Sequence, residues 1–395
     1  MRWSGVGEFK LRHGPADTPD VDTQVMSIDA LLERTVASGA SDLHVTVGAQ
    51  PAARVRGELR PLEGTQQFDA DETRSLLYRI LTTEQQKRFE IDRQLDFSYG
   101  VPGLARFRVN VYQQRESVAA AFRVIPDELK TMEELGLPEG LKALTSLPRG
   151  LVVVTGPTGS GKSTTLAALV DEINRTRTDH IITIEDPIEF LHRHKRCIVN
   201  QREIGVDATS FSAALRAALR QDPDVILLGE LRDLETISTA LTAAETGHLV
   251  FGTLHTQSAP STIDRIIDVF PSEQQDQVRT QIAGALQGVV TQTLVPTADT
   301  QGRVAALEIL LPDDAIRNLI RQGKIAQIYS YMQTGSRGGM QTMEQSLADL
   351  VVRRVIAPDE AIARSSRRDE LVALLQRLGA PLMASTTGDL NLAEV

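Results

Sequence analysis

The order of hydrophobic and polar positions in the first third of the chain predicts a small domain of helices and strands. After Ser27, which can cap a helix, apolar residues recur at helical spacing through residues 28–38, and Gly39 can end that helix. A second helix is predicted over residues 69–89. Alternating apolar and polar residues, typical of strands with one solvent-facing side, occupy residues 41–48, 53–62, 95–102 and 105–125. This mixture predicts an α+β domain of ordinary size.

The pattern changes at Leu151. Residues 151–155 form a continuous apolar run, which predicts a strand covered on both faces. Similar runs, separated by plausible helices, recur at residues 181–184, 225–228 and 249–253. This alternation predicts an open, mainly parallel α/β sheet with right-handed crossovers. Amphipathic helices are then predicted over residues 313–323, 343–355, 358–365 and 367–379.

These patterns divide the chain into six parts. Both ends lack sustained periodicity, and the segment before the α/β region holds prolines and glycines between short amphipathic pieces, which is typical of a linker. The predicted parts are a disordered tail (residues 1–25), an α+β domain (26–126), a linker (127–148), an α/β core (149–311), a helical C-terminal subdomain (312–378) and a flexible tail (379–395).

Composition narrows the classes of protein. Lys and Arg total 42 against 52 Asp and Glu, a net charge of −10, which does not suit a protein that grips nucleic acid through a broad basic surface. One cysteine, Cys197, in 395 residues excludes a disulfide framework and a four-cysteine zinc site. No apolar run reaches the ~18–20 residues of a membrane helix. We therefore expect a soluble, cytoplasmic protein that binds neither zinc nor nucleic acid.

Residues 156–164 predict a phosphate site. They match the G-x-x-x-x-G-K-[ST] loop at every fixed position, between a buried strand and a predicted helix. Glycines let backbone N–H groups turn inward around phosphates, where the positive end of the following helix also points. An ordinary glycine-rich turn, the alternative, does not explain the lysine. We predict that ATP and Mg²⁺ bind to Gly156, Pro157, Thr158, Gly159, Ser160, Gly161, Lys162, Ser163 and Thr164, with Lys162 on the β- and γ-phosphates and Ser163 on the metal.

Hydrolysis also needs carboxylates that hold the metal and orient water. Glu230 ends one apolar strand in the position of a Walker B acid, although Gly229 stands where the usual aspartate would be. Another strand is followed by Glu185, Asp186 and Glu189. Acids at strand ends often serve as helix caps, but four beside a phosphate loop favour catalysis. The residues alone do not choose between Glu185 and Glu189 as the base.

Two histidines and several arginines are further candidates. His255 directly follows an apolar strand, where it can sense the γ-phosphate, whereas for His248 a structural role is equally good. Arginines can stabilise the charge that develops on a transferred phosphoryl group, but each one is also explained as a solvated strand or helix residue. The candidates are Arg106, Arg108, Arg115 and Arg123 in the first domain and Arg216, Arg220 and Arg232 in the second.

Four segments resemble the motifs of a known family. GPTGSGKSTT, IITIEDPIEF, RQDPDVILLGELRD and AAETGHLVFGTLHT are similar to the Walker A, Asp box, Walker B and His box of the secretion ATPases that drive type II secretion and type IV pili. ASDLHVTVG and RFRVNVYQQR resemble that family's N-terminal PAS-like domain. Residues 315–321 reproduce the AIRNLIR motif of the retraction, or PilT-like, branch. The resemblance implies a RecA-like P-loop ATPase domain joined to a PAS-like domain.

The resemblance also implies roles for residues and partners. Glu189 would be the general base for water, and Glu230 would act with the metal, for which Glu185 is a further ligand candidate. His255 would sense the γ-phosphate, while Arg108 and Arg123 would reach phosphates. The family implies a homohexamer at the inner face of the cytoplasmic membrane, bound to a platform protein, that retracts pili.

Three other functions stay open. The first is a pilus-extension or type II secretion motor, against which the absence of four zinc-binding cysteines and the intact AIRNLIR segment speak. The second is a hexameric DNA translocase, because RecA-like sheets serve both purposes. The third is a nucleotide-binding regulator without hydrolysis, which the full set of acids disfavours.

Overall fold

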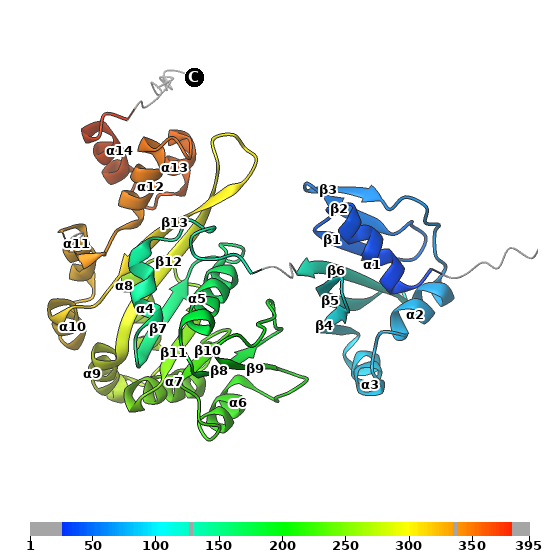
Figure 1. Cartoon of the computed structure of the whole chain (residues 1–395), viewed down its shortest axis with the longest axis horizontal. Coiled ribbons are helices and arrows are strands. Elements are labelled where there is room, and N and C mark those ends of the chain that lie inside the picture. The colour runs from blue at the N-terminus through cyan, green and yellow to red at the C-terminus, as the bar shows by residue number, and fades with distance from the viewer. Residues whose placement is uncertain (1–25, 126–128, 335–337, 381–395) are drawn as a thin grey trace, which may run out of the picture. The chain divides into compact units, whose positions relative to one another are not determined.

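The computed structural model describes residues 26–125, 129–334 and 338–380. The chain forms two compact units, one of residues up to Leu95 with Val109–Arg123, the other of Asp96–Arg108 with residues from Val124 onward. Figure 1 labels the elements. Over the described ranges, no helix is both long and apolar enough to cross a membrane. The domain boundaries expected from the sequence stay predictions.

The N-terminal elements include a six-stranded sheet in the order β3-β2-β1-β6-β5-β4. Strand β1 pairs antiparallel with β2 and β6, and this register places Leu43 beside Ala53 and Phe122, all of them buried. The elements are α1 (Ile28–Ala37), β1 (Asp42–Val45), β2 (Ala52–Val55), β3 (Glu58–Pro61), α2 (Ala70–Tyr78), α3 (Thr83–Asp92), β4 (Gln94–Val101), β5 (Ala105–Gln114) and β6 (Ser117–Ile125).

Two runs predicted as single strands are hairpins. Residues 53–62 turn back at Arg56 and Gly57, where φ is 51° and 89°. Residues 105–125 turn back at Arg115 and Glu116, where φ is 45° and 62°. Two successive residues with positive φ match the twist of a tight hairpin, so the alternation continues in sequence while the strand reverses.

The single helix predicted over residues 69–89 is also wrong, since the structure has α2 and α3 there. The Thr82 hydroxyl accepts the backbone N–H of Gln85, and the Gln85 side chain accepts the N–H of Thr82. This capping box satisfies the free donors at a helix start, so a new helix begins after Thr82.

The C-terminal part contains a seven-stranded sheet in the order β13-β12-β7-β11-β10-β8-β9. All neighbouring strands are parallel except β12 and β13. The prediction of a mainly parallel α/β sheet is confirmed, although β9, β12 and β13 were not predicted. Its elements are η1 (Glu139–Leu141), α4 (Lys142–Thr145), β7 (Gly150–Thr155), α5 (Lys162–Thr176), β8 (His180–Glu185), β9 (Ile198–Glu203), α6 (Phe211–Ala218), β10 (Val225–Leu228), α7 (Leu234–Thr246), β11 (Leu249–Leu254), α8 (Ala259–Asp268), η2 (Ser272–Gln274), α9 (Gln275–Ala285), β12 (Leu286–Pro296) and β13 (Arg303–Leu310).

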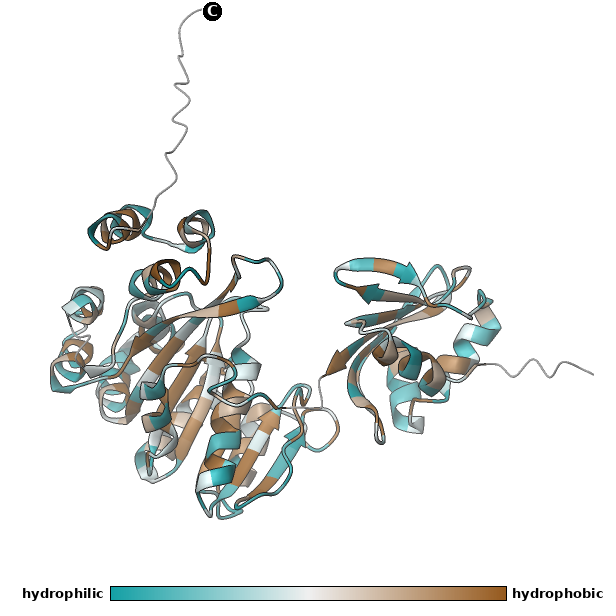
Figure 2. Ribbon diagram, turned by 45° about the horizontal axis from the view of Figure 1, so that its top comes forward, coloured by the Kyte–Doolittle hydropathy of each residue, from teal (hydrophilic) through white to brown (hydrophobic). Residues whose placement is uncertain are grey.

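Helices cover both faces of this sheet, as the continuous apolar runs predict. Val153 of β7 packs in a cluster with residues of α6 to α9, whereas Val152 and Val154 pack in another with α4 and α5. Figure 2 shows the apolar strands lying between helices. Because β7, β8, β10 and β11 are parallel, their carboxyl ends meet at one edge, where ligands bind in sheets of this kind.

The expected C-terminal helices are present, and one further helix, α11, was not predicted. Leu347 of α12 and Leu371 of α14 are buried with Val295 of β12 and Ala306 of β13. The helices are α10 (Asp314–Arg321), α11 (Ala326–Thr334), α12 (Met343–Val352), α13 (Pro358–Arg364) and α14 (Arg368–Arg377).

Candidate active site

The chain passes from β7 into α5 through a loop that requires glycine. Gly156, Gly159 and Gly161 have φ of 139°, 80° and 87°, a region that favours glycine. A Cβ at Gly156 would lie 2.2 Å from the backbone oxygen of Gln292 on β12. The three predicted loop glycines are therefore explained by backbone conformation, and Gly156 also by close packing.

Helix α5 presents an open N-terminus to this loop. Its N-cap, Gly161, has no side chain to occupy the free N–H groups, and no acidic residue stands in the first turn. The positive end of the helix dipole is thus free for an anion. Lys162 Nζ donates to the carbonyl oxygens of Gly156 at 2.9 Å and Pro157 at 3.1 Å, so its charge lies over the loop.

The charges of two glutamates act on Lys162. Burial lowers the pKa of Lys162, while the negative charges of Glu230 and Glu189 act in the opposite direction. The strand order accounts for this convergence, because β8 and β10 end at the same edge of the sheet as β7. The structure brings together Lys162, Glu189 and Glu230, three residues predicted to be catalytic from the sequence.

Glu230 is held by two cationic or polar groups. One carboxylate oxygen lies 2.7 Å from Arg232 Nη2, and the other lies 3.3 Å from His255 Nε2. Burial raises the pKa of Glu230, but Arg232 and His255 together lower it by more, so the net shift of the pKa is downward. Glu230 is therefore ionised near neutral pH, as a metal-binding carboxylate must be.

The structure explains why glycine precedes Glu230. A Cβ at Gly229 would lie 3.3 Å from Glu185 Cα and from the backbone oxygen of Ile184, both in β8. An aspartate at this position would crowd the neighbouring strand. The departure from the usual Walker B pattern is thus tied to the close approach of β10 to β8.

The acids after β8 differ in their surroundings. Glu185 Oε1 accepts hydrogen bonds from Thr183 Oγ1 at 2.6 Å and Gln201 Nε2 at 3.2 Å. Burial raises the pKa of Glu185, these hydrogen bonds lower it, and the charge of Glu189 adds to the rise, with a net upward shift. Asp186 is exposed and Glu189 is partly buried. Glu185 is engaged by its own strand and β9, which favours Glu189 as the base; the predicted metal role of Glu185 stays a prediction.

The two histidines lie at opposite ends of β11. The register pairs Leu254 with Thr155 and Leu249 with Gly150, so His255 stands at the phosphate loop and His248 at the far end, roughly 23 Å away at ~3.3 Å per residue. His248 Nδ1 lies 3.0 Å from the backbone oxygen of Ala243, at the end of α7. The structural role considered for His248 is the one its contacts support.

The predicted arginines have varied surroundings. Arg123, 71% exposed, forms an ion pair with Asp42 across the β1–β6 pair at 2.9 Å. Arg108 is exposed on β5. Arg216 pairs with Glu235, and Arg232 contacts Glu230 as described. Phosphate binding by Arg108 and Arg123 therefore stays a prediction.

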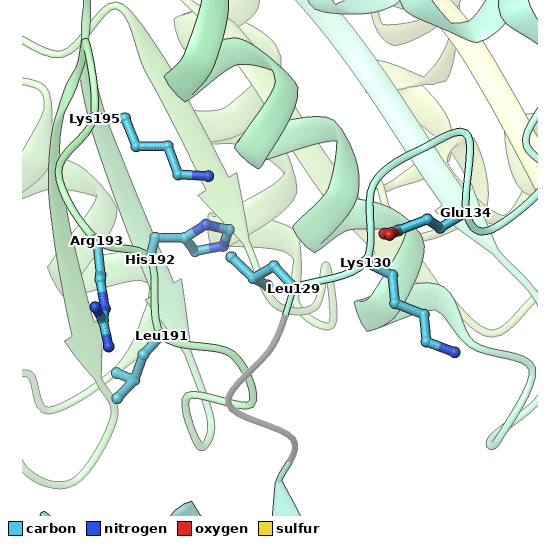
Figure 3. Close-up of a pocket in the computed structure, with 7 residues that line it drawn as sticks. All are labelled: Leu129, Lys130, Glu134, Leu191, His192, Arg193 and Lys195. Atoms are coloured by element: carbon cyan, nitrogen blue, oxygen red, sulfur yellow. The ribbon is translucent and has the colours of Figure 1, made fainter. Parts of the chain in front are cut away.

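A cavity of about 810 Å³ lies beside α5 (Figure 3). His192 is 9% exposed, and its Nδ1 has no hydrogen-bond partner in the described part of the chain. Burial lowers the pKa of His192 to about 4, so the ring is neutral at pH 7. Lys195 reaches Asp171 of α5 at 2.6 Å. The lining residues are Leu129, Lys130, Glu134, Leu191, His192, Arg193 and Lys195.

Two glutamines that the sequence analysis did not select organise this region. Gln201 accepts the N–H of His192 at 2.7 Å and donates to Glu185 and, at 2.8 Å, to the backbone oxygen of Phe190. It thus connects the cavity to the acids after β8. Gln292 contacts the phosphate loop from β12. A polar residue inside an apolar strand pattern, as in VVTQTL around Gln292, was the available sign.

The family comes from comparison with known proteins. The model of the type II/IV secretion system protein family matches residues 19–385. The chain belongs to this family. It is a PilT-like secretion ATPase: it is 54% identical over 341 residues to the type IV pilus retraction ATPase PilT of Pseudomonas aeruginosa, covering 85% of this chain and 97% of PilT.

Two further comparisons agree with this placement. A twitching motility protein of Neisseria gonorrhoeae is 49% identical over 321 residues, covering 81% of this chain and 86% of that protein. A crystal structure of the pilus retraction motor PilT with bound ADP is 50% identical with a TM-score of 0.83, covering 88% of this chain and 99% of that one. The expectation of a PilT-like secretion ATPase is therefore confirmed.

Proposed function

We propose that this secretion ATPase hydrolyses ATP with Mg²⁺ and uses the energy to retract type IV pili. The observation that carries hydrolysis is that the charges of Glu189 and Glu230 act on Lys162 at the edge of the sheet where β7, β8 and β10 end, beside a glycine loop and a free helix N-terminus. A phosphate site without acids would bind nucleotide, whereas these carboxylates add the groups that cleavage needs.

The residues fit ATP and Mg²⁺. The loop contains a buried hydroxyl, Ser160 Oγ, with no partner among the described residues, beside the open end of α5. Ser163 and the ionised Glu230 offer oxygen ligands of the kind that Mg²⁺ prefers. When bound, Mg²⁺ neutralises charge on the transferred phosphoryl group.

Each residue then has a defined task. Lys162 exchanges the backbone oxygens of Gly156 and Pro157 for phosphate oxygens. Glu189 takes a proton from the attacking water, and its partial burial limits competition from solvent. His255 lies 3.3 Å from Glu230 and between β11 and α8, so it is placed to sense the terminal phosphate beside the start of α8.

Turnover by two variants tests the ATPase assignment. Glu189→Gln removes the base but keeps the size, so we expect ADP binding close to that of the wild type and phosphate release reduced about 10²-fold or more. Lys162→Ala removes the phosphate contact, so both binding and release are lost. His248→Ala is the matched control and keeps turnover. Phosphate release by Glu189→Gln at the wild-type rate would contradict the assignment.

The cavity beside α5 is proposed to hold the base and ribose of the nucleotide. Its leucines and the neutral His192 ring suit an aromatic base, and it adjoins the helix that begins at the phosphate loop. His192→Ala should therefore weaken competition by ADP against a fluorescent nucleotide. Competition by inorganic tripolyphosphate should not change, because it has no base. An equal loss for both ligands would argue against this placement.

The motor function is proposed from the retraction branch that the chain resembles. A homohexamer at the inner face of the cytoplasmic membrane would act on a platform protein so that the pilus shortens. Residues 315–321 form most of α10, in which Ile316 and Ile320 are fully buried and Leu319 is partly exposed. Loss of Ile316 would therefore disturb the core, which makes Leu319 the better probe of the motor.

Deletion of the gene, with rescue by variants, tests retraction. Cells without the protein should carry surplus pili that never shorten, and Leu319→Ala should fail to restore shortening while still binding ADP. Bald cells would indicate an extension motor instead. A rise in ATP turnover on adding single-stranded DNA would favour the DNA translocase.

A further inference from the structure

Gln292 of β12 bridges two parts of the phosphate loop. Its side chain is buried, with 3% of the residue exposed. The amide Nε2 donates to the backbone oxygen of Ser160 at 2.7 Å, and Oε1 accepts from the Thr165 hydroxyl in the first turn of α5 at 2.7 Å. One side chain from a distant strand thus holds both the loop and the helix that follows it.

We infer that Gln292 is a positioning residue that sets the direction of the Ser160–Gly161 peptide, and thereby the phosphate affinity of the loop. This inference rests on the proposed function. In a trans peptide the C=O and the next N–H point in opposite directions. Because Gln292 draws the Ser160 oxygen toward β12, the N–H of Gly161 is directed away from β12, toward the open side of the loop.

The packing around Gln292 leaves this arrangement little freedom. A Cβ at Gly156 would meet the Gln292 backbone oxygen at 2.2 Å, and a Cβ at Gly161 would meet Gln292 Nε2 at 2.8 Å. The loop therefore lies directly on this residue. A carbonyl oxygen accepts only, so the NH₂ group of Gln292 must face Ser160 and its oxygen must face Thr165.

Two substitutions separate this role from simple packing. Gln292→Glu keeps the size but places a carboxylate against the Ser160 oxygen. Gln292→Met keeps the length and removes both hydrogen bonds. For both variants we expect the Kd for ADP and the KM for ATP to rise about tenfold, with kcat changed less than threefold, since the peptide contacts phosphate in ground and transition states alike.

A matched control lies one residue away. Thr291, 2% exposed, shares a hydrogen bond of 2.8 Å with Thr155 of β7. Thr291→Val should lower Tm without changing the Kd for ADP, because it weakens the strand pair and leaves the Ser160–Gly161 peptide held. If Gln292 only stabilises the fold, its variants will behave like Thr291→Val.

The outcomes distinguish the inference from the proposed function. Wild-type affinity for ADP in both Gln292 variants would overturn the inference, whatever happens to Tm. Absence of phosphate release by the wild-type protein would refute the proposed function. The Kd for ADP of the Gln292 variants would still test whether Gln292 sets the phosphate affinity of the loop. Gln292→Met, which adds no charge, carries the same test if Gln292→Glu does not fold.

Discussion

Glu308 makes the stability of the C-terminal unit depend on pH. It lies on β13, is 3% exposed, and accepts the N–H of Ala259 at the start of α8 at 2.5 Å. The pKa of Glu308 is raised from 4.5 to about 7, mainly by burial. The charge of Glu344 adds to the rise, whereas the N–H groups of Ala259 and Met343 and the charge of Arg367 act against it.

Proton linkage determines whether the free energy of unfolding rises or falls with pH. Between pH 4.5 and about 7 the folded protein holds a proton on Glu308 that the unfolded chain has lost, so the free energy of unfolding falls as pH rises through this window. Below pH 4.5 the proton on Glu308 contributes its full amount to the free energy of unfolding. Above about pH 7 that contribution is gone, and the free energy of unfolding no longer changes with the ionisation of Glu308. At 1.36 kcal/mol per pKa unit, the loss is about 3 kcal/mol.

Urea unfolding from pH 5 to pH 8 measures this effect. Glu308→Gln cannot ionise, so we expect its free energy of unfolding, relative to the wild type, to increase by about 2.5 kcal/mol between pH 5 and pH 8. Glu273→Gln, at an exposed position, is the matched control and should show no such trend. A difference that is constant with pH, or that grows as pH falls, would refute the reasoning.

Further predictions concern the loop, the histidines and the core. Gly156→Ala should abolish ADP binding measured by calorimetry, because its Cβ would lie 2.2 Å from a backbone oxygen; Gly159→Ala, with open space around it, should bind more weakly than wild type but measurably. His255→Ala should slow ATP turnover at least tenfold while His248→Ala stays within twofold, and equal effects would contradict their placement at opposite ends of β11. Phe251→Ala, fully buried in the sheet, should lower the free energy of unfolding by about 3–5 kcal/mol in urea titration.

Elements defined by their own residues could be predicted from the sequence. The strand at residues 151–155 is covered by helices on both faces, so its residues form a continuous apolar run. That run was therefore enough to predict a buried strand. The hairpin at Arg56 and Gly57 was missed since alternation continues through the turn, and the positive φ of an arginine leaves no sign in the pattern. Strand β12 begins at Leu286, directly after the last residue of α9, so no loop separates the helix from the strand.

Some residues of the candidate site could likewise be identified from local sequence, and others could not. The phosphate loop has fixed spacing within nine residues, so Lys162 and Ser163 could be selected directly. The residues alone did not separate Glu189 from Glu185, for which the family resemblance was needed; the hydrogen bonds from Thr183 and Gln201 to Glu185 now give a physical reason for the same preference. The role of Gln292 depends on contacts with residues more than 120 positions away, which no local pattern contains.

The central claim is that water oriented by Glu189 cleaves a terminal phosphate held by the loop after β7. A crystal structure with Mg²⁺ and a non-hydrolysable ATP analogue tests this most directly. We predict phosphates at residues 156–164, Lys162 released from its two backbone oxygens, and one water bridging the Glu189 carboxylate and the γ-phosphate. An empty loop, or a Glu189 side chain directed away from the γ-phosphate with another group on that water, would contradict the account.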